Sequence, residues 1–127
     1  MRTITTPDAP LPAGHYSQAI EHNGLIHIAA QLSLDPADPS RRPSGSIEAQ
    51  AERAITNLLA SVRAAGSNAD HILKVTIYLA DIAHWDKVNT IYTRLMGSAK
   101  PARAVIPVSG SLHFGSLIAV DATAAMP

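Results

Sequence analysis

An arginine in the last quarter of the chain is the residue best suited to hold a small acid. Arg103 lies within the segment 101–108, whose other members are small, apolar or proline. Its guanidinium carries forked donors that fit a carboxylate, and placing it at the start of an apolar strand costs desolvation unless an anion meets it. Two interpretations stay open: Arg103 anchors the carboxylate of a substrate, or it forms a structural ion pair or extends along the surface to water.

A carboxylate interrupts the last apolar run of the chain. Between about 116 and 123 the residues alternate, which predicts a strand, and Asp121 falls in the set that leaves the core. For the strand that begins at Pro101, we assign Arg103, Val105 and Pro107 to the face opposite the helices. Asp121 would then be a neighbour of Arg103 across the sheet. The pair is either a salt bridge or a site in which Arg103 holds a carboxylate while Asp121 orients or deprotonates water.

Two further polar residues are candidates for lining a site. Tyr16 comes just before the first predicted strand, where its phenol either lines a pocket or packs against a neighbour. Asn89 lies off the apolar stripe of the second predicted helix and is solvated or bonded to a loop unless an interface covers it. The six histidines show no ligand spacing, and no multiple-glycine loop joins a strand to a helix. We therefore expect no metal site and no nucleotide cofactor.

The elements that must position these residues follow from periodicity and breaking residues. Two strands at 17–21 and 25–32 flank the turn at 22–24, and the proline-rich segment 35–45 predicts an exposed loop. Ser46 caps a helix that ends at Gly66, and Asp81 caps a second helix that ends near Gly97. A strand at 72–79 separates the helices, and two strands follow the second helix.

This order predicts an α+β fold: a mixed sheet with two helices packed on one face. Two helices cover only one face. On the assignment above, the other face carries Val105, Leu117 and Ala119, an apolar surface that a monomer should not leave wet. We therefore expect the chain to associate with itself through that face.

Composition limits the remaining possibilities. The 127 residues, 46% of them hydrophobic, are sufficient for one domain spanning 1–127. Ten basic and ten acidic residues cancel, so no overall positive field favours nucleic acid or an anionic membrane. Absence of cysteine excludes disulfides and thiol chemistry, and the N-terminal segment resembles neither a signal peptide nor a membrane anchor. A soluble cytoplasmic protein is the expected class.

Seven segments in this order resemble the reactive intermediate deaminase (Rid) family, also called the YjgF or L-PSP family. The resemblance spans essentially the whole chain. It is carried by Gly14-His15-Tyr16-Ser17-Gln18-Ala19, Ile28-Ala29-Ala30-Gln31, the stretch from Gln50 to Gly66 with Asn57-Leu58-Leu59, Lys74-Val75-Thr76-Ile77-Tyr78-Leu79, Val88-Asn89 with Tyr92, Pro101-Ala102-Arg103 and Ile118-Ala119-Val120-Asp121-Ala122.

The resemblance implies a chorismate-mutase-like fold assembled as a homotrimer with three clefts between subunits. Similar proteins hydrolyse imines and enamines, such as 2-aminoacrylate and 2-iminobutanoate, to 2-keto acids and ammonia without a cofactor. By this resemblance Arg103 grips the carboxylate, and Tyr16 and Asn89 line the cleft. Asp121 stands where the family usually has a glutamate that positions the attacking water.

The chain departs from the family pattern at several of these positions. Ala29-Ala30 replaces the usual Ser-Gly before Gln31, which removes a hydroxyl and adds a methyl group beside the substrate. Asp121 is one methylene shorter than the usual glutamate, and catalytic geometry tolerates little displacement. Val105 stands where cysteine is frequent, His15 replaces a proline, and Leu112-His113 replaces Leu-Pro.

Three functions remain after these comparisons with the family pattern. The leading prediction is hydrolytic deamination of a small imine that carries a carboxylate, with Arg103 as anchor and Asp121 organising water. The first alternative is a trimeric protein that binds a carboxylate metabolite, such as a 2-keto acid, without catalysis. The second is a deaminase or hydrolase for a different enamine acid, admitted by the loss of the serine hydroxyl at Ala29. The ribonuclease name used for this family gains no support from a neutral chain without a basic stripe.

Overall fold

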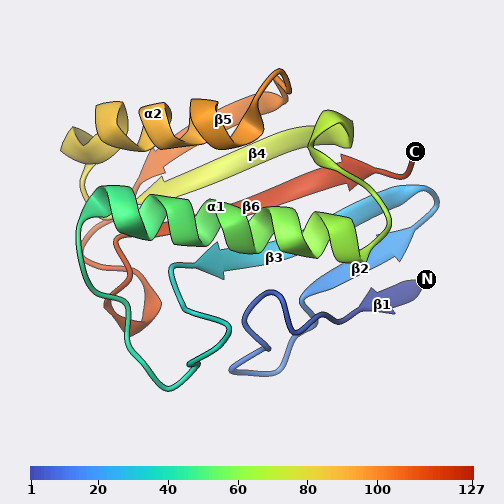
Figure 1. Ribbon diagram of the computed structural model, residues 1–127, viewed down its shortest axis with the longest axis horizontal. Helices are drawn as coiled ribbons and strands as arrows, with labels where there is room; N and C mark the ends of the chain where they lie inside the picture. Colours follow the sequence, from blue (N-terminus) through green and yellow to red (C-terminus); the bar gives the residue numbers. More distant parts are fainter.

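The computed structural model describes all residues 1–127, and its central element is one six-stranded mixed sheet in the order β1-β2-β3-β6-β4-β5 (Figure 1). The strands are β1 (Arg2–Ile4), β2 (Ala19–His22), β3 (Leu25–Leu32), β4 (Ile72–Leu79), β5 (Ala102–Pro107) and β6 (Ile118–Ala125). Neighbouring strands are antiparallel except β4 and β5, which run parallel with α2 between them in the chain. The predicted α+β class is confirmed.

The N-terminal hairpin forms as the sequence predicts. Asn23 and Gly24 connect β2 to β3, and both have positive φ (52° and 79°), the conformation that a two-residue hairpin turn requires. Strand β1 was not predicted. It is three residues long and pairs with β2, with Arg2 opposite Glu21, so it is too short for its alternation to be visible in the sequence.

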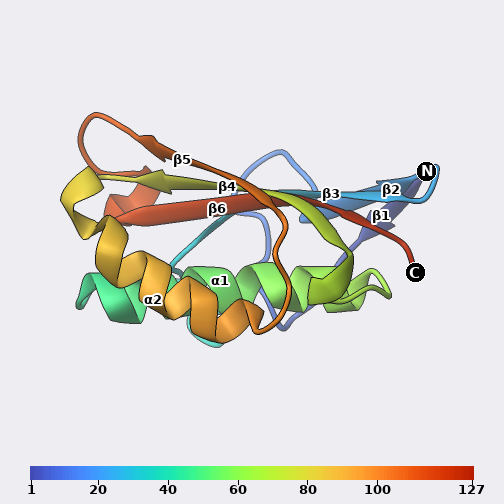
Figure 2. The same ribbon diagram turned by 90° about the horizontal axis from the view of Figure 1, so that it is seen from above.

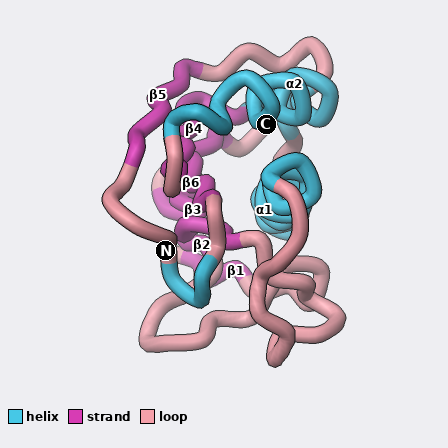
Figure 3. The backbone as a smooth tube through the Cα atoms, turned by 90° about the vertical axis from the view of Figure 1, so that its left-hand side faces the viewer, coloured by secondary structure: helices cyan, strands magenta, loops and turns pink.

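The first helix begins and ends at the expected residues, and the second ends as expected but begins one short turn after the predicted cap Asp81. Ser46 accepts a hydrogen bond from the Ala49 amide and begins α1 (Ile47–Ala64), after which Gly66 adopts φ 93°. Asp81 caps a short 3₁₀ turn (Ile82–His84) that leads into α2 (Trp85–Met96), and Gly97 follows with φ 63°. Figure 2 and Figure 3 show both helices on the same face of the sheet, which confirms the predicted packing.

The core lies between this face and the helices. It contains a cluster of 22 buried apolar residues. Val75, Ile77 and Leu79 of β4 are fully buried and belong to this cluster together with Ile55 and Leu58 of α1. The predicted inward set of β6, from Ile118 to Ala124 in alternation, is also buried. No helix of the protein combines the length and the hydropathy needed to cross a bilayer.

The orientation of β5 differs from the prediction. The register places Arg103 beside Val75, Val105 beside Ile77 and Pro107 beside Leu79. Directly paired residues of neighbouring strands share a face of the sheet, and this set of β4 is the buried one. Arg103, Val105 and Pro107 therefore lie on the face that the helices cover, not on the opposite face.

The composition of the uncovered face changes accordingly. Ala104 and Ile106 occupy it in place of Val105, and the side chain of Ile106 is 41% exposed. Ala119, which was expected to be exposed there, is only 3% exposed. An exposed apolar residue on an uncovered sheet face remains, so the reason for expecting self-association persists with a different residue.

Candidate functional site

Arg103 is held against α2 by one hydrogen bond and two aromatic rings. Its Nη1 donates to Asn89 Oδ1 at 3.0 Å. The guanidinium carbon lies 4.6 Å from the ring centroid of Trp85 and 5.0 Å from that of Tyr92. Cation–π contacts at these distances orient the guanidinium without neutralising its charge. The predicted proximity of Arg103 and Asn89 arises because β5 returns beside the helix that precedes it.

No carboxylate of the chain pairs with Arg103. The two salt bridges of the protein join Arg2 to Glu21 at 3.9 Å and Arg94 to Glu52 at 3.0 Å. A guanidinium has five N–H donors, and that of Arg103 makes a single hydrogen bond, to Asn89. The structural ion pair considered from the sequence is therefore not formed, and most donors of Arg103 remain available for an anion.

A cavity of about 350 Å³ adjoins this arginine, between the end of α2 and the start of β5. Lys100 and Tyr92 contribute to its wall. The Tyr92 hydroxyl is buried without a hydrogen-bond partner, and burial raises the pKa of this phenol, although the charge of Arg103 acts in the opposite direction. Tyr92 consequently stays a neutral donor, beside two cations that no acidic side chain neutralises.

Asp121 lies on the other face of the sheet. It pairs with Thr76, and its Oδ2 accepts a hydrogen bond from the Tyr78 hydroxyl at 3.1 Å. Burial, this hydrogen bond and the charge of Asp121 together raise the pKa of Tyr78. The predicted outward orientation of Asp121 is correct, but the predicted proximity of Arg103 and Asp121 is wrong, because the strand carrying Arg103 presents it to the helices.

Ala29 and Ala30 lie at a β-bulge near the end of β3. The register with β6 shifts between Ile28 and Gln31, so one extra residue is accommodated on β3. The backbone N–H of Ala29 donates to the carbonyl of Gln18, and the side-chain Nε2 of Gln31 donates to the carbonyl of Ala29 at 3.0 Å. Bulges redirect side chains and are frequent beside active sites. The bulge aims Ala30 toward the segment that carries Tyr16.

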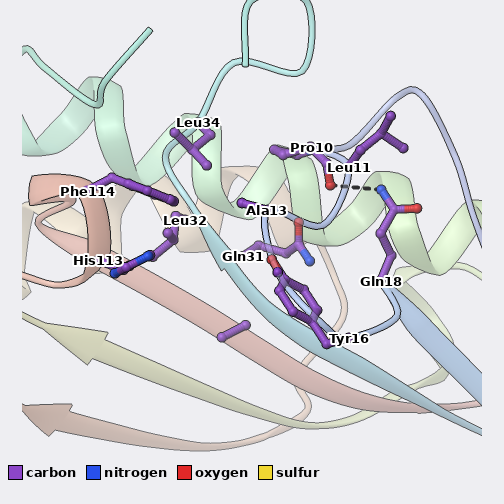
Figure 4. A pocket seen from close by; sticks show the side chains of 12 residues that line it. Pro10, Leu11, Ala13, Tyr16, Gln18, Gln31, Leu32, Leu34, His113 and Phe114 are labelled. Atoms are coloured by element: carbon purple, nitrogen blue, oxygen red, sulfur yellow. Dashed lines mark hydrogen bonds between the residues drawn. The ribbon is translucent and has the colours of Figure 1, made fainter. Parts of the chain in front are cut away.

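Tyr16 and Ala30 line a common cavity of about 120 Å³, shown in Figure 4. Its wall comes from the N-terminal segment, from the end of β3 and from His113 and Phe114 of the loop before β6. Tyr16 stands at the rim with 55% of its surface exposed. The predicted role of Tyr16 in lining a pocket is therefore supported by its position.

Gln18, which the sequence did not single out, holds this wall in place. Its side chain is 2% exposed, accepts from the Thr6 amide and donates to the carbonyls of Thr6, Ala9 and Pro10. Trp85, Tyr92 and Phe114 were also missed as site residues. Nothing in the sequence signals that the two helical aromatics contact Arg103.

The candidate residues form two groups at opposite edges of the sheet. Arg103, Asn89 and Val105 belong to the β5 edge, whereas Tyr16, Ala29 and Ala30 belong to the β1–β2–β3 edge (Figure 1). Strands β6 and β4 separate them. One chain therefore does not bring the two groups together around one small molecule. No group of three or more His, Cys, Asp or Glu side chains is placed to hold a metal ion.

Comparisons with known proteins agree with this arrangement of elements. The model of the endoribonuclease L-PSP family matches residues 6–126. A RutC family protein of Synechocystis is 36% identical over 128 residues, covering 100% of this chain and 98% of that protein. The 2-iminobutanoate/2-iminopropanoate deaminase of Capra hircus is 37% identical over 123 residues, covering 97% of this chain and 88% of that protein. The crystal structure of the YjgF gene product of E. coli has a TM-score of 0.93 at 27% identity and covers 100% of both chains.

Proposed function

Because the chain belongs to the endoribonuclease L-PSP family, we propose that it hydrolyses small 2-imino acids to 2-keto acids and ammonia. The observation that carries the proposal is the state of Arg103. Its guanidinium is fixed by Asn89, Trp85 and Tyr92, yet no carboxylate of the chain neutralises it. An oriented, uncompensated guanidinium is suited to a planar carboxylate, the group that every 2-imino acid carries.

The reaction needs only positioning and proton transfer. Arg103 holds the substrate carboxylate, and water attacks the adjacent imine carbon to form a carbinolamine. The proton that the water loses on addition goes to the imine nitrogen. The proton of the new hydroxyl then follows it, the C–N bond breaks, and ammonia leaves while the carbonyl forms. Asp121 is the carboxylate assigned to orient the water and accept its proton. No cofactor takes part in this scheme.

We place the site between subunits. Arg103 and Asp121 face opposite sides of the sheet in one chain, and Tyr16 and Ala30 lie at the far edge from Arg103. A second copy would bring its Tyr16 edge, or its Asp121 face, against the Arg103 edge of the first. A homotrimer with three such clefts satisfies this requirement and covers the exposed Ile106 on each sheet.

Assembly gives a direct prediction. At micromolar concentration the purified chain is expected to have about three times its monomer mass of 13.4 kDa by light scattering coupled to gel filtration. Ile106→Glu places a charge on the uncovered face and is expected to shift the mass toward the monomer, because burying an unpaired carboxylate in an interface is costly. Ile82→Glu, at an exposed isoleucine of the 3₁₀ turn before α2 and off the sheet, is the control for added charge. A wild-type mass equal to one chain would contradict the intersubunit site.

The activity is tested with imines generated in situ by an amino acid oxidase. Free imine is trapped with semicarbazide, and both ammonia and 2-keto acid are measured. The protein is expected to accelerate keto-acid formation and to decrease the semicarbazone yield in proportion to its concentration. If 2-keto acids bind to the protein while no imine is hydrolysed above the uncatalysed rate, the protein is a carboxylate-binding member of the family rather than a deaminase.

A further inference from the structure

The cavity beside Tyr16 has more room than the smallest substrate side chain, a methyl group, would fill. Its volume is about 120 Å³, and its lining includes Tyr16, seen in Figure 4, and the bulge residue Ala30. Leu11, Leu32 and Leu34 form its apolar wall. Since Tyr16 and Ala30 line the proposed cleft, this cavity continues that cleft on the side away from the carboxylate anchor.

The two buried polar side chains of the wall, Gln18 and Gln31, already make hydrogen bonds within the protein, whereas Tyr16 and His113 are exposed. All the side-chain hydrogen bonds of Gln18 go to the backbone of residues 6–10, and the amide of Gln31 donates to the carbonyl of Ala29. A ligand group that passes the two exposed side chains meets the apolar residues, which are seven of the twelve that line the cavity. Such a lining favours an apolar group and gives little to a charged or hydroxylated one, which would lose its hydration without replacement.

Phe114 closes the cavity in a conformation that needs support. Its backbone has φ 61°, a left-handed region that is strained for a bulky residue. The guanidinium carbon of Arg42 lies 4.2 Å from the centroid of the Phe114 ring. The centroids of the His113 and Phe114 rings are 4.0 Å apart. These two contacts restrain the Phe114 ring, so this side of the cavity keeps its position.

The volume indicates which side chain fits. An engineered apolar cavity of about 150 Å³ is large enough to bind benzene. A cavity of about 120 Å³ suits a group slightly smaller than that ring, such as a branched chain of four carbons. The methyl group of 2-iminopropanoate would leave most of this space empty, and the unfilled apolar volume would contribute nothing to binding.

We propose that this cavity binds the side chain of a branched aliphatic 2-imino acid, so that leucine-type imines are better substrates than the imine of alanine. The proposal rests on the proposed function. It goes further because it assigns Leu11, Leu34 and Phe114 to substrate choice.

The test compares two imines that differ in the side chain alone. The imines of leucine and alanine are generated by amino acid oxidases, and kcat/KM is measured for each. The wild-type protein is expected to favour the leucine imine by about tenfold or more, the discrimination that a few methylene groups provide in an apolar pocket. Leu11→Trp, at an exposed position of the wall, is expected to reduce this ratio at least about fivefold by filling the cavity. Leu73→Trp, at another exposed leucine, near the start of β4 and outside the cavity wall, is the control and should leave the ratio unchanged.

Calorimetric binding of the two product 2-keto acids separates this proposal from the proposed function. The keto acid with the isobutyl side chain is expected to bind wild-type protein about tenfold or more tightly than pyruvate, and Leu11→Trp should remove the difference. If that preference is seen without turnover, the deaminase function fails and the cavity assignment holds. If both imines are hydrolysed equally well and both keto acids bind equally, the cavity assignment is wrong.

Discussion

Replacing Arg103 with alanine is expected to lower kcat/KM for imine deamination by roughly 150-fold, which corresponds to about 3 kcal/mol. The physical reason is loss of the charged, forked donor that meets the substrate carboxylate. Lys100 is the other cation that lines the same cavity at the β5 edge. Substrate binding should weaken most, so the change is expected mainly in KM. Steady-state kinetics with the oxidase-coupled assay measures both constants.

Two comparisons make the Arg103 result specific. Arg103→Lys keeps the charge but loses the fork and the planar contact with Trp85, so it should restore only part of the activity. Asp121→Asn should instead lower kcat with little change in KM, because it removes the proton acceptor and not the anchor. The side chain of Arg103 is exposed and contacts only Asn89 and the rings of Trp85 and Tyr92, so melting temperature and mass should stay close to wild type. Full activity of Arg103→Ala would show that the carboxylate is held elsewhere.

Gln18→Ala is expected to destabilise the protein by about 2–4 kcal/mol, the largest effect on stability that we predict. The side chain accepts from the Thr6 amide at 2.7 Å and donates to the carbonyls of Thr6, Ala9 and Pro10 at 3.0, 3.2 and 2.9 Å. Truncation leaves buried backbone groups unpaired and a cavity behind the N-terminal segment. Chemical denaturation, with the midpoint and slope fitted together, measures the loss.

The same substitution should also disturb the cavity wall. Pro10 and Leu11 belong to the segment that Gln18 anchors. In Gln18→Ala, the ratio of kcat/KM for the leucine imine to that for the alanine imine should therefore decrease, in addition to the free energy of unfolding. Gln18→Leu preserves the side-chain volume and separates the lost hydrogen bonds from the lost packing. Glu48→Ala, on the exposed side of α1, is the control for a neutral surface change. A loss below about 0.5 kcal/mol for Gln18→Ala would mean that water satisfies the freed groups.

Local chemistry was sufficient to predict most elements. The apolar repeat between Ser46 and Gly66 and the alternation at 72–79 each correspond to one element of the structure, α1 and β4. Helical period, a capping hydroxyl and a glycine at the C-terminal end are local signals, so they are readable without the rest of the chain. Strand β1 lacked such a signal because three residues show no period, and it forms only where β2 offers an unpaired edge.

The residue types of the site were predictable, but their arrangement was not. The sequence by itself determined that Arg103 is an isolated cation in an apolar strand and that Asp121 points away from the core. It also showed that Tyr16 and Ala30 belong to segments that resemble a known family. Alternation shows that Arg103 and Ala104 point in opposite directions. It does not show which of them meets the helices, because both sets contain small or apolar residues.

Only the tertiary structure decided that question. The parallel register of β4 and β5 places Arg103 level with the buried Val75, which turns the guanidinium toward Trp85 and Asn89 and away from Asp121. The strand order likewise separates Arg103 from Tyr16 by the width of the sheet, and the extra residue at Ala29–Ala30 sets the direction of the bulge. Register and strand order are settled by contacts between segments far apart in the chain, and such contacts leave no local pattern in the sequence.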